Sequence, residues 1–410
     1  MKRKIDVLLV SPNDKSNSIY LISLFNCFKS KLNYFAILSR SKKKISDTSG
    51  INVTDNDSRI KFIPEQLFAI FLFAVILWKR PKIAHFQHEY AWYLGSILLL
   101  IFVIETKILR IRSIITMHSV MYEHPKELFV LENSNTIGKK MKMAYVKSVN
   151  RFIAIFSDSI IVHTEKSRSD LGRIKISKMK VKVIPHGVGI NMPSETETRP
   201  CSKKKNIDEL CIVTPGYIEL RKGQDIAINI LNELTNLRVP SHLHIIGEPV
   251  KNKNNTVLLR KLIQLSTGVP VYFDFNYLPI DELQDYIVRS DIVLLPYRHR
   301  VGNGPEQTNA SGVLSLSLSV GKPVVCSDLP YFNEVLGHLR PNVIFNESII
   351  SEAVSIISNL YMNKKLLGFL SEQIRKIVSN DISWKAVSLL HEKLYNSILG
   401  YRPANGFLNE

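Results

Sequence analysis

Residues 211–225 read Cys-Ile-Val-Thr-Pro-Gly-Tyr-Ile-Glu-Leu-Arg-Lys-Gly-Gln-Asp. The first four form a short apolar run, which is typical of a buried strand. Gly216 allows a turn after this run, and a helix is predicted to begin near Asp225. A strand that leads through a glycine turn into a helix is the repeating unit of a parallel sheet with helices on its faces.

The same alternation of short apolar runs and longer helical stretches continues along the chain in both directions. It predicts an α/β fold with two Rossmann-like domains that face each other across a cleft. Ligands of such sheets bind beyond the carboxyl ends of the strands, so we expect the active site in that cleft. The predicted strands are Val7–Val10, Phe35–Leu38, Ile83–Phe86, Ile114–Met117, Ser159–Val162, Val181–Ile184, Cys211–Thr214, His242–Ile246, Val271–Phe273, Ile292–Leu295 and Pro323–Cys326.

A polar segment, residues 191–208, separates the two sets of strands and contains Pro193 and Pro200. This composition indicates a linker. The predicted domains are therefore residues 1–190 and 209–382. Residues 383–410 begin with the pattern of an amphipathic helix, which either packs within the second domain or crosses back to brace the first.

Positive charge is concentrated in the first half of the chain. The formal net charge is +18, and residues 1–200 contain 32 Lys and Arg against 16 Asp and Glu, whereas residues 201–410 contain 22 against 20. Nucleic acid, an anionic membrane or an acidic substrate would each suit a basic surface. The sequence has no basic–aromatic interleaving and no nucleic-acid-binding module, so we predict no nucleic-acid partner.

The four cysteines are Cys27, Cys201, Cys211 and Cys326. They form no CxxC pair and lack zinc-finger spacing, so neither a disulfide scaffold nor a structural zinc site is expected. This use of cysteine suits a reducing compartment, and we expect a cytoplasmic protein.

Two apolar stretches, Leu67–Trp78 and Ala91–Ile104, are both shorter than the ~20 residues that a spanning helix needs. One interpretation makes them buried helices of an α/β domain. The other places part of their faces, with the nearby Lys79 and Arg80, in the interface of an anionic bilayer. The first interpretation is favoured for much of each segment, and the basic charge of the first half supports the second without proving it.

Two glycine-containing segments of the second half suit an anionic ligand. Gly216 lets the backbone approach a phosphate closely, and Arg221 and Lys222 supply positive charge just before a helix. Asn309-Ala310-Ser311-Gly312-Val313 opens another helix, whose first amides could hold a phosphate or sugar hydroxyls. A solvated basic loop and a plain strand-to-helix turn are the alternatives.

Histidines follow several predicted strands of the first half. His118 lies directly after Ile114–Met117, where it can hydrogen-bond a sugar hydroxyl or phosphate or transfer a proton. His186, after the last of these strands, is expected to have a structural role at the domain junction. The cluster His85, His88 and Glu89 lacks a second acidic group, so we expect it to line an acceptor pocket rather than to bind a metal.

Taken together, these motifs resemble those of the GT-B fold glycosyltransferases, specifically the retaining group 1 (family 4) class, in their order and spacing. The resemblance covers nearly the whole chain. The segments that carry it are Ile115–Val120, Ile161–Thr164, Val183–Val188, Arg221–Gly223, Ile245–Gly247, Tyr277–Pro279, Ser290–Tyr297, Gly321–Val325 and Ile382–Trp384.

The resemblance implies transfer of a sugar from a nucleotide-diphosphate-sugar without a metal ion or other cofactor. Lys222 matches the lysine that steadies the diphosphate, and His118 matches the histidine that contacts the donor sugar. The family usually has two glutamates ahead of its Gly-x-Pro-Val-Val segment, and their positions here are held by Thr308 and Leu316. Glu306 is near enough to replace one of them. Tyr217 stands where an arginine is common, and Arg221 would compensate.

We therefore predict a glycosyltransferase that uses a lipid-linked or saccharide acceptor in surface polysaccharide synthesis. The basic first domain would contact an anionic membrane surface, which places the enzyme peripherally at the inner face of the plasma membrane. The alternative is a degenerate, inactive relative that lost activity with the two glutamates and acts as a binding subunit.

Overall fold

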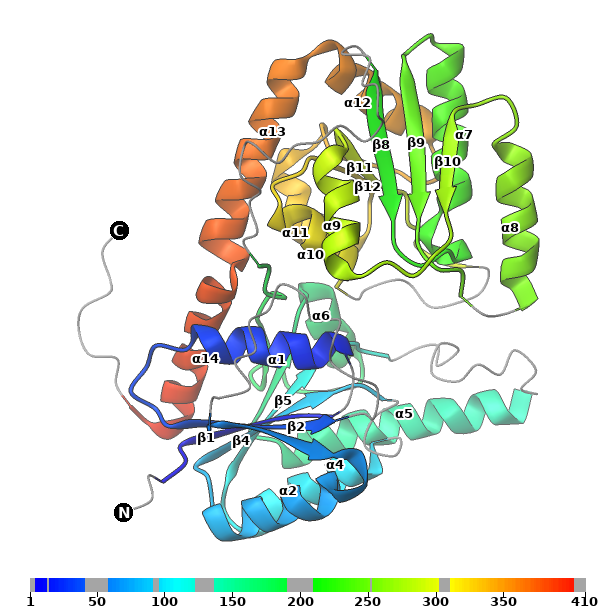
Figure 1. Ribbon diagram of the computed structural model, residues 1–410. Helices are drawn as coiled ribbons and strands as arrows, with labels where there is room; N and C mark the ends of the chain where they lie inside the picture. Colours follow the sequence, from blue (N-terminus) through cyan, green and yellow to red (C-terminus); the bar gives the residue numbers. More distant parts are fainter. Residues whose placement is uncertain are drawn as a thin grey trace. The chain divides into compact units, whose positions relative to one another are not determined.

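The computed structural model describes residues 4–12, 15–40, 58–90, 96–121, 136–189, 209–250, 253–301 and 310–401. The chain forms two compact units (Figure 1). The first takes in the described residues up to Gly187 and those from Trp384 onward, and the second takes in most of those between. The predicted linker, residues 191–208, lies outside the described residues.

The first unit contains a sheet of seven strands in the order β3-β2-β1-β4-β5-β6-β7, and every pairing is parallel. Each strand predicted in this half is present. Strand β3 was not predicted, because Lys61 and Pro64 leave its sequence, IKFIP, without a continuous apolar run. The strands are β1 (Val7–Ser11), β2 (Tyr34–Arg40), β3 (Ile60–Pro64), β4 (Ile83–His88), β5 (Arg112–Met117), β6 (Ser159–Val162) and β7 (Val181–Val183).

Helices cover both faces of this sheet, which is why every residue of β1, β4 and β6 is buried. Helix α14 contacts α1 on one face, while α2, α4 and α5 lie on the other (Figure 1). Within the described residues, no helix is both long and apolar enough to cross a membrane. The helices are α1 (Lys15–Cys27), α2 (Glu65–Lys79), α4 (Ile97–Ile108), α5 (Thr136–Phe156), α6 (Glu165–Arg173) and α14 (Trp384–Leu399).

Helix α14 belongs to the first unit although it comes last in the sequence. Val387 and Tyr395 are buried in one core with residues of α1, β1 and β2. The Glu392 carboxylate accepts hydrogen bonds from the backbone amides of Lys29 and Ser30 at 2.8 and 2.7 Å. These amides follow the end of α1, so the carboxylate ties the final helix to the first one.

The second unit contains a sheet of six parallel strands in the order β10-β9-β8-β11-β12-β13. The two sheets confirm the predicted α/β class with two Rossmann-like domains. The strands are β8 (Leu210–Pro215), β9 (Ser241–Ile246), β10 (Val271–Asp274), β11 (Ile292–Leu295), β12 (Val324–Ser327) and β13 (Ile344–Phe345).

Helices also cover both faces of the second sheet. Helices α7 and α12 contact each other on one face, and α9 and α10 contact each other on the opposite face (Figure 1). The helices are α7 (Gln224–Asn236), α8 (Lys253–Leu265), α9 (Ile280–Arg289), α10 (Gly312–Ser319), α11 (Pro330–Leu336), α12 (Ile350–Met362) and α13 (Lys364–Ile377).

Candidate functional site

The carboxyl ends of β8 and β9 carry two glycines that no other residue can replace without strain. Gly216 has φ +111°, and a Cβ there would lie 2.9 Å from Val313 Cγ2. Gly247 has φ +140°, and its Cβ would lie 2.3 Å from the Gly216 carbonyl oxygen. The two loops and the start of α10 are therefore in close contact, and they present backbone rather than side chains at this edge.

Lys222 lies in the same region, at the end of a single turn of 3-10 helix, Leu220–Lys222. Its ammonium donates to the Tyr297 hydroxyl at 2.8 Å and lies 4.0 Å from the centre of the Tyr297 ring. No carboxylate of the described residues forms an ion pair with it. A neutral phenol positions the ammonium without neutralising it, so its positive charge stays available to an anion.

The start of α10 completes this group. The Ser311 hydroxyl caps the helix by accepting from the Leu314 amide at 3.3 Å, and it lies 3.4 Å from the Tyr297 hydroxyl. The remaining first-turn amides, at exposed Gly312 and half-buried Val313, have no acceptor within the helix. We call Gly216, Lys222, Tyr297, Ser311 and Val313 the cradle. Backbone amides and one ammonium are the groups that bind a phosphate.

A buried ion pair holds the loop that carries Lys222. Arg298 forms two hydrogen bonds with the Asp225 carboxylate, both 2.9 Å, and also donates to the Leu220 carbonyl at 2.6 Å. Burial alone would raise the pKa of Asp225, but hydrogen bonds from Arg298 and Lys261 hold it below the ordinary value. The loop is therefore held by Tyr297 and Arg298, which follow β11 and lie far from Lys222 along the chain. Their contact with the loop was not predicted from the sequence.

The other residues predicted for this site are distributed as follows. Arg221 donates to Glu219 at 2.7 Å, so its charge is compensated locally. Leu316 lies on α10, half-buried, and its side chain offers no hydrogen bond. Glu306 and Thr308 lie outside the described residues.

In the first unit, histidines end four neighbouring strands. His85 and His88 lie on β4, His118 follows β5, and His163 and His186 follow β6 and β7. Parallel strands bring their carboxyl ends to one edge of the sheet, which is why residues so distant in sequence meet here. All of these histidines except His163 were predicted as candidates from the sequence. His163 contacts His118 because β5 and β6 are neighbours in the sheet.

Three of these histidines and Gln87 of β4 form a hydrogen-bonded chain. We call His85, Gln87, His118 and His163 the histidine network. His163 Nδ1 donates to the Ile184 carbonyl at 2.9 Å, and its Nε2 lies 3.1 Å from His118 Nδ1. His118 Nε2 lies 2.8 Å from Gln87 Oε1, and Gln87 Nε2 lies 3.5 Å from His85 Nε2. The network links the ends of three strands.

The network has two proton arrangements. Since His163 donates through Nδ1, a neutral His163 accepts at Nε2, and His118 must then donate through Nδ1 and accept at Nε2. In that arrangement the Gln87 side-chain amide must point its nitrogen toward His118, so that Nε2 of Gln87 donates to Nε2 of His118. If Gln87 Oε1 faces His118 instead, His118 must donate from Nε2, and the pair His118 and His163 must carry one additional proton. Burial lowers the pKa of His163 to about 3 and that of His118 well below its ordinary value, which favours the neutral arrangement.

Aromatic side chains enclose the network. The Tyr20 ring meets His118 edge-on at 4.9 Å between centroids, and it lies 5.0 Å from the ring of Trp384 on α14. Trp384 leaves no room for a side chain at Gly187, where a Cβ would lie 2.2 Å from its ring. His186, which precedes this glycine, packs on Trp384 at 5.6 Å, as suits a structural residue.

The three residues predicted to face an acceptor differ in their surroundings. His85 is fully buried, and Tyr395 Oη and Thr116 Oγ1 each lie 2.7 Å from one of its ring nitrogens. His88 is also fully buried, and its ring nitrogens have no hydrogen-bond partner among the described residues. Glu89 is half-buried and accepts from the Ser119 hydroxyl at 2.5 Å. The acceptor role of these residues stays a prediction.

Two family models match the chain. The model described as Glycosyltransferase Family 4 matches residues 49–191, and the one described as Glycosyl transferases group 1 matches residues 209–363. Together they span most of the chain, the first from β3 to β7 and the second over the whole sheet of the second unit. No curated protein matches the sequence.

Solved structures of the same fold are similar along almost the whole chain. HepE of Anabaena, solved in complex with UDP, is 14% identical with a TM-score of 0.69, covering 96% of this chain and 100% of its own. Sucrose-phosphate synthase of Thermosynechococcus elongatus is 13% identical with a TM-score of 0.66, covering 97% and 100%. The lipopolysaccharide outer core galactosyltransferase WaaB is 11% identical with a TM-score of 0.58, covering 96% and 100%.

Identities this low show the fold alone, and the family comes from the two models that match the two halves in order. The cradle occupies the half matched by the group 1 model, and the histidine network occupies the half matched by the family 4 model. The chain therefore belongs to the group 1 (family 4) glycosyltransferases, enzymes built from two Rossmann-like domains in the GT-B manner.

Proposed function

We propose that the enzyme transfers a sugar from a nucleotide-diphosphate-sugar to a lipid-linked or saccharide acceptor, with retained configuration and without a metal ion. The observation that carries the donor assignment is the cradle, in which the Lys222 ammonium stands beside the start of α10 with no carboxylate of the described residues paired to it. HepE, which shares the fold, was solved with UDP and with UDP-glucose, which supports a nucleotide-sugar donor.

The chemistry follows from where charge develops. As the bond between the anomeric carbon and the diphosphate breaks, negative charge grows on the leaving phosphate. Lys222 and the amides of Gly312 and Val313 are placed to stabilise that charge, which is the task that a metal ion performs in other transferases. Leu316 cannot bind the ribose hydroxyls, so we propose that Glu306 or the backbone of the cradle holds them.

His118 is proposed to contact the donor sugar. Its ring is held from both sides, by His163 at Nδ1 and by Gln87 at Nε2, so its orientation is fixed before substrate binds. Its lowered pKa keeps the ring neutral, which suits a sugar hydroxyl better than a phosphate. Both ring nitrogens have partners in this structure, so the hydroxyl would replace Gln87 at Nε2. His163 is then a positioning residue for His118.

The acceptor side is proposed to work at an anionic membrane on its cytoplasmic face. Helices α2 and α4 contact each other and expose large apolar side chains, which we call the apolar helix surface. Lys79, Arg80 and Lys107 lie at the ends of these helices, and such a pairing of apolar and basic groups is typical of interfacial helices. The members of this surface are Leu67, Ile70, Phe71, Phe73, Leu77, Trp78, Ile97, Ile101, Ile104 and Ile108.

The resemblance to WaaB, whose name places it in lipopolysaccharide outer core synthesis, supports a role in surface polysaccharide assembly. A donor screen tests the transferase proposal. The purified enzyme is incubated with UDP-sugars and GDP-sugars, with and without bacterial membrane extract, and released nucleotide is measured. We expect acceptor-dependent release with one donor class. Binding of a nucleotide without any turnover across all donors and extracts would contradict it and favour the inactive binding subunit.

Liposome co-sedimentation tests the membrane proposal separately. Binding should rise with the anionic lipid content and fall when Ile70 and Trp78, which are 71% and 78% exposed, are both replaced by serine. Val257→Ser is the matched control, because Val257 is 67% exposed on α8 of the second unit. Binding that ignores lipid charge, or that responds equally to the control, would contradict the membrane assignment without affecting the donor assignment.

A further inference from the structure

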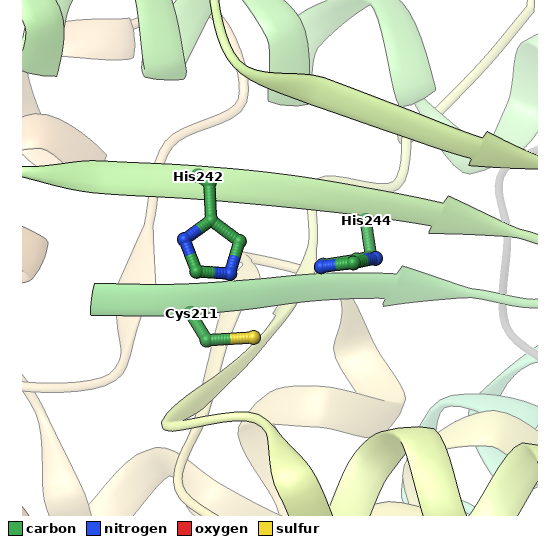
Figure 2. Close-up of side chains that lie close together, drawn as sticks. All are labelled: Cys211, His242 and His244. Carbon is green, nitrogen blue, oxygen red and sulfur yellow. The ribbon is translucent and has the colours of Figure 1, made fainter. Parts of the chain in front are cut away.

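One thiol and two imidazoles, which are groups that bind transition metals, lie close together in the second unit, apart from the cradle. Cys211 on β8 pairs directly with His242 on β9, and His244 follows on the same face of β9. One ligand atom from each of the three residues lies within 4.8 Å of the others. Figure 2 shows the Cys211 sulfur and the two imidazole rings gathered at one place along β8 and β9. We call these residues the Cys–His cluster.

The histidines of the cluster hold unused ring nitrogens. His242 is only 5% exposed and His244 is half-buried, yet Nε2 of each is buried with no hydrogen-bond partner among the described residues. A buried polar atom without a partner costs roughly 1–3 kcal/mol, so most such atoms in proteins have a protein, water or ion partner. Two of them beside one thiol indicate a shared ligand.

Neighbouring side chains orient the rings of His242 and His244 toward a shared ligand. Glu209 Oε1 lies 3.1 Å from His242 Nδ1, so that nitrogen donates to the carboxylate and leaves Nε2 with its lone pair toward the cluster. His244 stacks on Tyr272 with ring centroids 5.0 Å apart, which fixes the plane of the second ring. A carboxylate behind a ligating histidine is the usual outer partner in zinc sites.

We propose that Cys211, His242 and His244 bind one Zn²⁺ ion. Two neutral imidazoles and a thiolate match the ligand preference of this ion, and hard ions such as Mg²⁺ and Ca²⁺ prefer oxygen. Ligand atoms of a tetrahedral zinc site lie roughly 3.3–3.8 Å apart, so small side-chain rotations from the observed arrangement complete the site. Binding releases the Cys211 thiol proton to solvent, and water fills the fourth position.

The ion would stabilise the sheet and would take no part in sugar transfer. Cys211 is the second residue of β8, whereas Gly216 of the cradle follows the last. At about 3.3 Å per residue these positions lie roughly 16 Å apart along the strand. The site therefore connects β8 to β9 near their amino ends, and metal binding to the folded unit raises its stability by mass action.

Metal binding to the whole chain tests the proposal. The purified protein is loaded with Zn²⁺, dialysed and analysed for bound metal, and Co²⁺ replaces Zn²⁺ as a spectroscopic probe. We expect one Zn²⁺ per chain, a higher melting temperature with Zn²⁺, and a thiolate-to-cobalt charge-transfer band. Cys211→Ser should abolish that band, and Glu209→Gln should weaken Zn²⁺ affinity about 10–100-fold by removing the outer partner of His242.

Cys326→Ser is the matched control, because Cys326 is a buried thiol on β12 of the same sheet. It should keep the bound Zn²⁺ and the cobalt band. His244→Gln changes a half-buried side chain and serves where Cys211→Ser fails to fold. Absence of stoichiometric Zn²⁺ from the wild-type protein, or a cobalt band that survives Cys211→Ser, would overturn the proposal.

Discussion

The two units both contain a parallel sheet covered by helices, but they differ in the polar groups at the carboxyl edge of that sheet. The first unit buries a row of histidines at the carboxyl edge of its sheet and lowers the pKa of each by burial. The second unit leaves its carboxyl edge to glycines and one lysine, and it holds the nearby loop with the Asp225–Arg298 ion pair. The same sheet edge thus supports a neutral, closely packed surface in one unit and a positively charged cradle in the other.

Under the proposed function, this difference would separate two tasks within one architecture. A cradle of backbone amides and an ammonium suits a diphosphate, whose charges need compensation. A rigid edge of neutral imidazoles suits sugar hydroxyls, which need oriented hydrogen bonds. The excess positive charge of the first half lies outside this neutral edge, for example at Lys79 and Lys107 beside the apolar helix surface.

The largest expected effect is selective unfolding of the first unit in acid. The pKa values of His88 and His163 are lowered to about 3 and that of His391 to about 4, from an ordinary 6.5. The unfolded chain binds protons below about pH 6.5 that the folded unit cannot bind, so stability is complete above this pH and falls as the pH drops toward 4. Each of these three imidazoles costs on the order of 3 kcal/mol at pH 4. Together they cost about 9 kcal/mol, which is comparable with the roughly 5–15 kcal/mol that stabilises a typical domain.

Tryptophan fluorescence measures this loss in the first unit, because Trp78 and Trp384 belong to it and residues 188–383 contain no tryptophan. Hydrogen exchange of peptides from β8 and β9 provides the internal control for the second unit. The pKa of Asp225 is lowered below 3.8, so its ion pairs should persist to more acidic pH. If the native tryptophan fluorescence and the hydrogen-exchange protection of β8 and β9 were lost together near pH 5, the two units would not differ in acid stability.

The next largest effect is expected from Lys222→Ala. Removing the ammonium that is proposed to stabilise the leaving diphosphate should lower turnover on the order of 10²–10³-fold and weaken nucleotide binding, with the fold intact. Circular dichroism and nucleotide titration check the two parts. Lys376→Ala, at an exposed ion pair with Glu372 on α13, is the matched control and should behave like the wild type. Unchanged nucleotide affinity in Lys222→Ala would move the donor site away from the cradle.

A smaller effect, of opposite pH dependence, is expected at Glu105 on α4. Its carboxylate is buried without a partner among the described residues, and burial raises its pKa to about 7 from an ordinary 4.5. The unfolded chain releases this proton above about pH 4.5 while the folded unit retains it, so the wild type loses stability as the pH rises to 7. Glu105→Gln should therefore stabilise the first unit by on the order of 2–3 kcal/mol at pH 8.

Urea unfolding at pH 8 and pH 5.5 measures this difference, which should fall by about half or more at the lower pH. Glu65→Gln, an exposed position on α2, is the control and should change stability little at either pH. An equal gain at both pH values would mean that Glu105 acts through packing rather than through its charge.

The smallest effect is expected from Tyr297→Phe. The variant keeps the ring beneath the Lys222 ammonium but loses the hydroxyl that contacts Lys222 and Ser311. A single hydrogen bond contributes about 1 kcal/mol, so donor affinity should fall roughly 5-fold. Isothermal titration with the donor nucleotide measures the change, with Tyr286→Phe, whose hydroxyl donates to Asp274, as the control. A loss as large as that of Lys222→Ala would show that Tyr297 contributes more than positioning.

Strands buried on both faces were predictable because their apolar runs are continuous. Ile292–Leu295 and Ser159–Val162 were predicted with the bounds that the structure has. The half-buried edge strand Ile60–Pro64 and the two-residue strand Ile344–Phe345 were not, since such segments have too few apolar residues to stand out. The loop of the cradle was also predictable, because its glycine and lysine residues lie within a few positions of one another in the sequence.

What the sequence by itself determined is therefore local: the α/β class, the strands, the cradle loop at Gly216 and Lys222, and the family to which they belong. Only the tertiary structure decided which distant groups meet. His163 reaches His118, Tyr297 reaches Lys222 and Ser311, and Cys211 lies beside His242 and His244 although cysteine spacing alone indicated no zinc site. The physical reason is that parallel pairing aligns strands separated by whole helices, so neighbours across a sheet leave no mark in the spacing along the chain.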